Sequence, residues 1–224
     1  MGRLGCLPLA VVLFLMIALP IFFIGMLNTA LVKLHLNAPG AMLVIVGIMV
    51  GSVVNIPIAR IPRGDDVPVQ QPPPFWPPGM WPAPREMPKE TVVAVNLGGC
   101  IIPSSLAIYE LMYLVADGSA LTALAAAVVA TTLVCYLLAR PVAGLGILMP
   151  GLVPALVAAL MALMLAPASA PPVAFIAGVA GPLVGADLLH LREMTRTASA
   201  IVSVGGAGTF DGILLSGIVA AYLA

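Results

Sequence analysis

Three carboxylic acids lie inside otherwise apolar segments of the chain: Glu110, Asp187 and Asp211. Ionisable side chains at such positions are costly to hold away from water, so they mark candidate functional sites. Asp187 comes about one helical turn before the end of one apolar segment, and Asp211 comes about one turn after the start of the next. Because consecutive membrane-crossing helices are antiparallel, we expect both aspartates at the same depth near one membrane face.

Two carboxyl groups that lie close together share a single proton, because both cannot be ionised cheaply. One then takes a proton from water, while the other, still protonated, polarises a scissile carbonyl. The pair Asp187 and Asp211 is therefore a candidate aspartic-protease dyad. In the alternative interpretation, Asp187 caps a helix end or pairs with Arg192, and Asp211 caps the start of the last helix, where the helix dipole favours a negative charge.

The segment between the two aspartates reads Ile-Val-Ser-Val at 201–204 and continues with Gly205, Gly206 and Gly208. The β-branched residues predict a short extended piece, and the glycines predict a bend that exposes backbone. A peptide substrate that adds as a strand to this edge would bring a peptide bond to the aspartates. The three glycines are therefore candidate substrate-binding residues, and a flexible connector is the alternative.

Glu110 falls in the middle of its apolar segment and is a candidate proton or cation site. Alternatively, it is a protonated acid that bonds a neighbouring helix, with Tyr109, Tyr136 or an asparagine as partner. His190 follows Asp187 by three positions and either bonds that aspartate or lies among the lipid headgroups. We treat Glu110 and His190 together as a second candidate polar site.

The amino-acid composition indicates what kind of structural elements carry these residues. The chain is 62% hydrophobic and 8% charged, whereas soluble domains carry roughly 25% charged residues. So few charges cannot cover a water-facing surface, and membrane lipids are the expected surroundings. The formal positive and negative charges cancel, and no basic patch is interleaved with aromatic residues. Both observations argue against a protein that binds nucleic acid. The three cysteines and two histidines show no zinc-ligand spacing, so we expect neither a metal nor another cofactor.

We predict an all-α polytopic membrane protein in which residues 1–224 form a single transmembrane domain. Helices that cross the bilayer need roughly 17–25 apolar residues. Seven segments are predicted to cross: 7–27, 39–58, 100–116, 119–139, 149–166, 173–191 and 208–224.

Basic residues gather in cytoplasmic loops, and this bias orients the chain. Of the nine Lys and Arg residues, all but Lys33 fall on the side of the N-terminus if seven segments cross. The pattern predicts a cytoplasmic N-terminus and an external C-terminus.

The longest polar segment, 60–90, is rich in proline and is predicted to be a cytoplasmic loop rather than a domain. Residues 53–61 and 91–97 flank it and have strand character. We expect them to pair as a short β-hairpin at the cytoplasmic boundary. Pro57 and Pro62 should confine the first strand to an edge of the sheet, because proline lacks the amide that a central strand needs.

Several segments resemble a prokaryotic membrane family catalogued only as a domain of unknown function. They are 181–190 (GPLVGADLLH), 205–212 (GGAGTFDG), 55–58 (NIPI) and 96–99 (NLGG). More distantly, the aspartate pair resembles the GxGD intramembrane aspartyl proteases, which include presenilin, signal peptide peptidase and the prepilin peptidases. That resemblance implies catalysis by Asp187 and Asp211 near the cytoplasmic face of a prokaryotic plasma membrane, on a transmembrane peptide substrate.

Two other functions fit the same residues. One is a small proton-coupled transporter that uses Glu110, Asp187 and Asp211 as coupling sites, with helices broken at proline and glycine. The other is a non-catalytic membrane scaffold whose Gly/Ala-rich helices pack closely.

Overall fold

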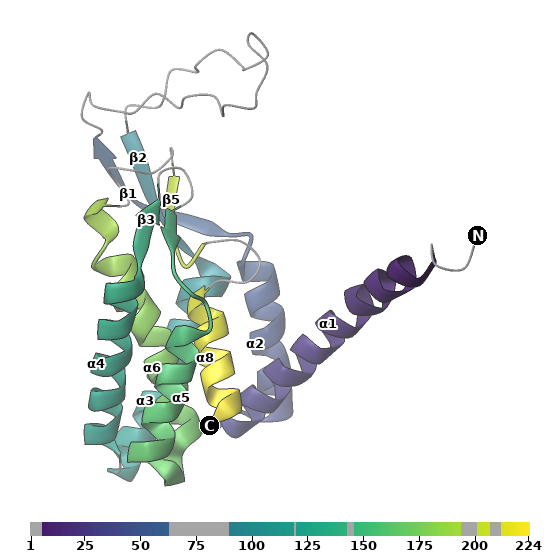
Figure 1. The fold of residues 1–224 in the computed structure, drawn as a ribbon. Helices are drawn as coiled ribbons and strands as arrows, with labels where there is room; N and C mark the ends of the chain where they lie inside the picture. Colours follow the sequence, from purple (N-terminus) through teal and green to yellow (C-terminus); the bar gives the residue numbers. More distant parts are fainter. Residues whose placement is uncertain (1–5, 63–89, 119, 143–145, 194–200, 207–211) are drawn as a thin grey trace.

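Apolar helices make up most of the chain, and a small sheet lies at one end of their bundle (Figure 1). The structure is a computed structural model, and it describes residues 6–62, 90–118, 120–142, 146–193, 201–206 and 212–224. The elements are α1 (Cys6–Lys33), α2 (Ala38–Gly51), β1 (Asn55–Pro62), β2 (Glu90–Asn96), η1 (Leu97–Ile101), α3 (Ile102–Asp117), α4 (Leu121–Leu138), β3 (Arg140–Val142), β4 (Gly146–Leu148), α5 (Val153–Leu165), η2 (Pro167–Ser169), α6 (Ala170–Gly181), η3 (Pro182–Leu188), β5 (Ile201–Val204) and α8 (Gly212–Leu223).

Four helical stretches in the described part of the chain are long and apolar enough to cross a membrane: Val11–Lys33, Leu97–Asp117, Leu121–Leu138 and Pro167–Leu188. The other apolar helices, α2, α5 and α8, are shorter, with 14, 13 and 12 residues. Large apolar side chains such as Phe14, Met42 and Leu137 are exposed along the helices. Such surfaces suit lipid rather than water, so the apolar helices indicate a membrane protein.

The predicted helix over 39–58 is wrong in its second part. Helix α2 ends at Gly51, and Asn55 begins strand β1. Gly51 packs against the backbone of Gly98, where an added Cβ would lie 2.9 Å from the Gly98 nitrogen. Beyond it, Val53, Val54 and Pro57 favour extended backbone, because β-branched side chains and proline are poor in helices. The chain therefore leaves the helix after 14 residues.

The predicted hairpin is confirmed. Strand β1 pairs antiparallel with β2, and the sheet order is β1-β2-β5, so β1 with its two prolines is an edge strand. The predicted extended piece at 201–204 is strand β5, which pairs parallel to β2. The proline-rich stretch 63–89 between the two hairpin strands lies outside the described residues. A second hairpin, of the two strands β3 and β4, connects α4 to α5; no sequence pattern predicted it.

Helices α6 and α8 form the centre of the bundle, where small residues let backbones approach closely. A Cβ added at Gly178 would lie 2.9 Å from the Cα of Gly217, and one added at Gly217 would lie 2.6 Å from a methyl carbon of Val179. Helix α1 leans away from the other helices along most of its length, and only its last turns are buried against them (Figure 1).

Candidate functional site

Asp187 belongs to a π-helix, η3, which follows directly on α6. Pro182 begins this π-helix and supplies no amide hydrogen, which interrupts the regular α-helical bonding. Gly185 of η3 lies directly against the backbone of α4, where an added Cβ would collide with the carbonyl oxygen of Thr132. Short π-helical turns inside α-helices occur frequently at functional sites. The distortion holds Asp187 at the sheet end of the bundle, partly buried.

The Asp187 carboxylate accepts a hydrogen bond from the backbone amide of Gly205, with 3.2 Å between Oδ2 and the nitrogen. Gly205 directly follows strand β5 and has a φ of +68°, a conformation that favours glycine. An added Cβ there would lie 2.6 Å from the Cβ of Cys100 in η1. Glycine is therefore required at this position for two separate reasons, and it brings β5, η1 and η3 together.

Next to the contact between Asp187 and Gly205, a group of hydrogen-bonded polar side chains joins the strands of the sheet to one another. The Asn96 side chain is 1% exposed. Its Oδ1 accepts a hydrogen bond from the Gly99 amide at 2.8 Å, and its Nδ2 donates to the Ser52 carbonyl at 2.7 Å. Nδ2 of Asn96 also donates to Oδ1 of Asn55 at 3.1 Å. The same oxygen accepts a bond from the Ser203 hydroxyl at 2.6 Å. These bonds connect the end of α2 with all three strands.

Of the predicted site residues, the structure brings Asp187 and Gly205 into direct contact. Gly206 follows immediately, and an added Cβ there would collide with the Ser203 hydroxyl. Gly208 and Asp211 lie outside the described residues, so the dyad stays a prediction.

His190 is buried, with 7% of its surface exposed. Its Nδ1 is 3.1 Å from the carbonyl oxygens of both Gly185 and Ala186, so this nitrogen donates back to its own helix. Its ring packs on Tyr136 at a centroid distance of 5.0 Å. His190 therefore stabilises the η3 segment that carries Asp187.

Glu110 is fully buried, and its partner is His35, in the connection between α1 and α2. Nδ1 of His35 is 2.8 Å from Oε2 of Glu110, and the backbone amide of His35 donates to Oε1 at 3.0 Å. Tyr109, a predicted partner of Glu110, instead donates its hydroxyl to the His35 carbonyl at 2.9 Å. The ring of Tyr113 stacks on the His35 ring at 4.4 Å between centroids.

His35 was not among the predicted site residues, because it lies between two apolar segments rather than inside one. The available signal was indirect: a buried glutamate needs a partner, and the chain has only two histidines.

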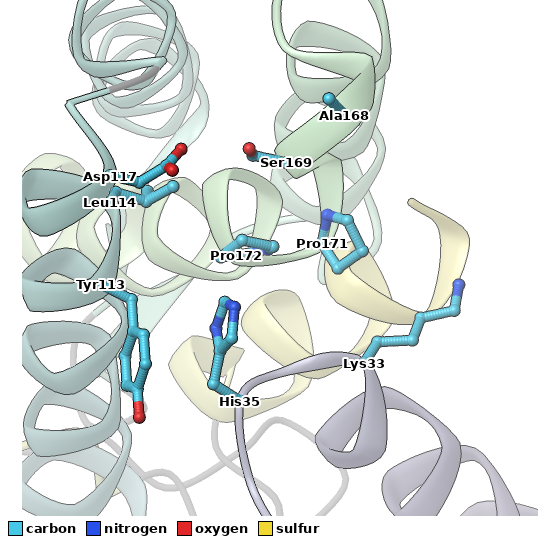
Figure 2. A pocket seen from close by; sticks show the side chains of 9 residues that line it. All are labelled: Lys33, His35, Tyr113, Leu114, Asp117, Ala168, Ser169, Pro171 and Pro172. Carbon is cyan, nitrogen blue, oxygen red and sulfur yellow. The ribbon is translucent and has the colours of Figure 1, made fainter.

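His35 opens onto a pocket of about 420 Å³ (Figure 2). The α1–α2 connection that carries His35 lies at the end of the bundle opposite to the sheet (Figure 1). The pocket is lined by Lys33, His35, Tyr113, Leu114, Asp117, Ala168, Ser169, Pro171 and Pro172. These residues come from the end of α1 and the α1–α2 connection, from the end of α3, and from η2 with the start of α6. Neither Glu110 nor Asp187 lines it.

Within the described ranges, no group of three or more His, Cys, Asp and Glu side chains is placed to hold a metal ion. Cys100 and Cys135 are buried thiols beside the Asp187 region, packed against Gly205 and Gly185 respectively.

Fold and composition together define a helical membrane protein with a small sheet at one end of the bundle. The chain belongs to the family described as Protein of unknown function (DUF1614), whose model matches residues 49–223. This match covers every residue of the Asp187 region discussed above and begins after His35. No curated protein and no solved structure matched the chain.

Proposed function

We propose that this protein is an intramembrane aspartyl protease-like enzyme in which Asp187 and Asp211 form the catalytic dyad. The observation that carries the proposal is the hydrogen bond between Asp187 and the Gly205 amide. This bond connects the partly buried carboxylate of Asp187, on the π-helix η3, to the turn at Gly205 that follows β5. Gly205 precedes Asp211 by only six positions in the sequence.

In the proposed reaction, one aspartate is ionised and the other is protonated. The ionised carboxylate takes a proton from water, and the resulting hydroxide adds to the scissile carbonyl carbon. The protonated acid meanwhile donates a hydrogen bond to the carbonyl oxygen. Transfer of a proton to the leaving nitrogen breaks the C–N bond and gives a new carboxyl and a new amine terminus.

Strand β5 supports the substrate-binding part of the proposal. Among the described strands it forms the edge of the sheet next to η3, and its end contacts Asp187 through Gly205. A transmembrane peptide unwound into extended form would pair with this edge by backbone hydrogen bonds. Gly205, Gly206 and Gly208 would then lie alongside the bound substrate backbone, next to the aspartates.

The proposed membrane arrangement has seven spans, with the N-terminus in the cytoplasm, the C-terminus outside and the sheet at the cytoplasmic face of a prokaryotic plasma membrane. The distribution of basic residues supports it, because Arg60 of β1 and Arg140 of β3 lie at the sheet end, whereas Lys33 lies at the opposite end. Helices α2, α5 and α8 would cross only with local thinning of the bilayer.

The test is cleavage of a panel of single-span membrane peptides by the full-length protein in liposomes. Asp187→Asn should lower the cleavage rate by about a hundredfold or more, because it removes one of the two acid–base groups. Glu90→Gln is the matched control, since Glu90 is an exposed acid on β2 and its loss should leave cleavage unchanged. Cleavage that persists in Asp187→Asn would rule out the mechanism. Absence of cleavage by the wild type across the panel would favour a scaffold.

One observation favours proton-coupled transport as a second candidate, namely the buried pair of Glu110 and His35. An acid held in the bundle and bonded to a half-exposed histidine could bind and release a proton from the side opposite to the sheet. The test is proton movement into liposomes after a pH jump. Transport lost in Glu110→Gln and retained in Asp187→Asn would favour this candidate over proteolysis.

A further inference from the structure

The two outer strands of the three-stranded sheet differ in what their free edges offer to a further strand. Among the described strands the order is β1-β2-β5, so β1 and β5 each have one side without a partner strand. Such an edge exposes a row of backbone amides and carbonyls that can bond another extended chain. Backbone groups along a strand point alternately to one side and to the other. The pairing with β2 therefore determines which residues of β1 and β5 face the free side.

One hydrogen bond fixes which residues of β2 bond to β1. The amide of Leu97, directly after β2, donates to the carbonyl of Val54 at 2.9 Å. The register that pairs Asn55 with Asn96 places Leu97 and Val54 directly opposite each other, so they form a bonded pair. Bonded and non-bonded pairs alternate along antiparallel strands. Counting back from Leu97, the odd-numbered residues of β2 therefore bond toward β1, and the even-numbered residues bond toward β5.

Both prolines of β1 face its free side. Pro57 lies opposite Ala94 and Pro62 lies opposite Glu90. These partners are even-numbered residues of β2, so neither proline belongs to a bonded pair, and the backbone of each points away from β2. Proline has no amide to offer there. Arg60, which also pairs with an even-numbered residue, keeps its outward amide. Prolines placed in this way prevent another strand from pairing, so β1 is a protected edge.

Strand β5 has no proline and keeps its outward amides. It runs parallel to β2, with Ser203 beside Ala94. Because Ala94 bonds toward β5, its backbone pairs with Val202 and Val204, and the backbone groups of Ile201 and Ser203 face the free side. Within the described residues, neither Ile201 nor Ser203 makes a backbone–backbone hydrogen bond outside the sheet. Each of these two residues thus presents an amide and a carbonyl to a further chain.

Asp187 takes the next place in the outward row of β5. The alternation predicts that the amide of Gly205 faces the free side, as those of Ile201 and Ser203 do. This amide donates to Oδ2 of Asp187 at 3.2 Å. The carboxylate therefore occupies the place of the carbonyl that a further strand would contribute, about 7 Å along the strand from Ser203. A chain that pairs with Ser203 must end its pairing at Asp187, where its backbone lies beside the carboxylate.

We propose that β5 is the docking edge for an extended peptide segment, which pairs with the backbone of Ile201 and Ser203 and ends its pairing at the Asp187 carboxylate. The segment is recognised by its backbone groups rather than by particular side chains. The inference rests on the proposed proteolysis for the fate of the peptide. It places the bond to be cut within roughly two residues of the one that pairs with Ser203.

Three versions of one peptide, acetyl-Val-Thr-Val-Thr-Val-amide, test the pairing: unmodified, N-methylated at alternate residues, and N-methylated at every residue. Alternate N-methylation blocks one edge of a strand and leaves the other free, whereas full N-methylation blocks both. Binding to full-length Asp187→Asn protein in detergent is measured by calorimetry, so that no turnover interferes. Asparagine keeps an oxygen that can accept from the Gly205 amide.

We expect the unmodified and the alternately methylated peptides to bind alike, and the fully methylated peptide to bind about tenfold or more weakly. A peptide bound as a helix would lose its affinity with either modification, because both remove the amides that a helix needs. Equal loss for the two methylated peptides, equal binding of all three, or no binding of the unmodified peptide would overturn the proposal.

Proline substitutions in the same background assign the binding to one edge. Ser203→Pro removes an outward amide and leaves the bonds between β5 and β2 in place, so it should weaken binding of the unmodified peptide about tenfold or more. Arg60→Pro removes an outward amide of β1 and should leave binding unchanged. Ser203→Ala removes only the hydroxyl and should also leave it unchanged.

Thermal unfolding shows whether each variant is folded. Full binding by a folded Ser203→Pro variant, or an equal loss of binding in Arg60→Pro, would overturn the assignment to β5. If Ser203→Pro does not fold, the three peptides decide the question alone.

Cleavage assays separate this inference from the proposed proteolysis. If the peptides bind in the expected pattern and the wild-type protein cleaves no membrane peptide, the docking edge stands and the catalytic dyad fails. If cleavage occurs and keeps its full rate when Ser203→Pro is introduced into the wild-type protein, the dyad stands and the docking edge fails.

Discussion

The backbone amide of Gly205 donates to the carboxylate of Asp187 across 18 positions of sequence, at 3.2 Å. This single bond connects the π-helix η3 to the turn that ends β5. Gly205 in turn packs on Cys100 at the start of the helix that follows β2. The contact therefore holds the acid, the sheet and the neighbouring helix start in one arrangement.

Gly205→Ala should destabilise the fold by about 2 kcal/mol or more, because it adds backbone strain and a collision with Cys100. Gly118 is the matched control. It has the same φ of +68° but open space around it, so Gly118→Ala should cost only about 1 kcal/mol. Denaturant unfolding in detergent measures both variants. Equal losses at the two positions would show that the packing against Cys100 does not matter.

Gly217→Ala should loosen the crossing of α6 and α8, since the new methyl group would press on Val179 and Phe175. Overpacking of this kind costs about 1–3 kcal/mol. Gly25→Ala in α1 meets nothing within 4 Å and should stabilise its helix by up to about 1 kcal/mol. The two variants are compared by thermal unfolding in the same detergent. A neutral Gly217→Ala would contradict the close approach of these helices.

Asn96→Ala should cost about 2–3 kcal/mol, because it removes the cap of η1 and leaves the Ser52 carbonyl and Gly99 amide without their partner. Asn37 caps α2 in the same manner through the Gly40 amide, but it is exposed. Asn37→Ala should therefore cost only about 1 kcal/mol. Chemical unfolding of the two variants side by side would reveal the difference, and a larger loss at Asn37 would be the opposite of our expectation.

We expect the contributions of His35 and Glu110 to the free energy of unfolding to be strongly coupled. His35→Ala leaves the buried Glu110 carboxylate without its ring partner, which is more costly than removing both groups. In a double-mutant cycle with Glu110→Leu, we expect an interaction energy of about 1–3 kcal/mol. If the losses in the free energy of unfolding simply add, the 2.8 Å contact between His35 and Glu110 contributes no net stabilisation.

Part of the fold was predictable from local sequence. The content of strand-forming residues predicted the β1–β2 hairpin and β5, and Pro57 and Pro62 correctly indicated an edge strand. The apolar segments located the helices. The early end of α2 was not predicted, because it depends on the approach of Gly51 to Gly98, 47 positions away in the chain.

The site was less predictable. Apolar surroundings were enough to select Asp187 and Glu110, since a buried acid is conspicuous in such a composition. Their partners were not predictable, because Gly205 contributes a backbone amide and His35 comes from a loop far away in sequence. The π-helical geometry of η3 was not predicted either: Pro182 is a local signal for interrupted helical bonding, but the close approach of Gly185 to α4 is a long-range contact.

The distance between the carboxyl groups of Asp187 and Asp211 tests the central claim most directly. An experimental structure of the full-length protein in a lipid environment gives this measurement. The proposed dyad requires a separation of roughly 3–7 Å, close enough to share a proton directly or through one water. A separation beyond about 10 Å, with Asp211 facing away from Asp187, would contradict the proposed catalytic mechanism.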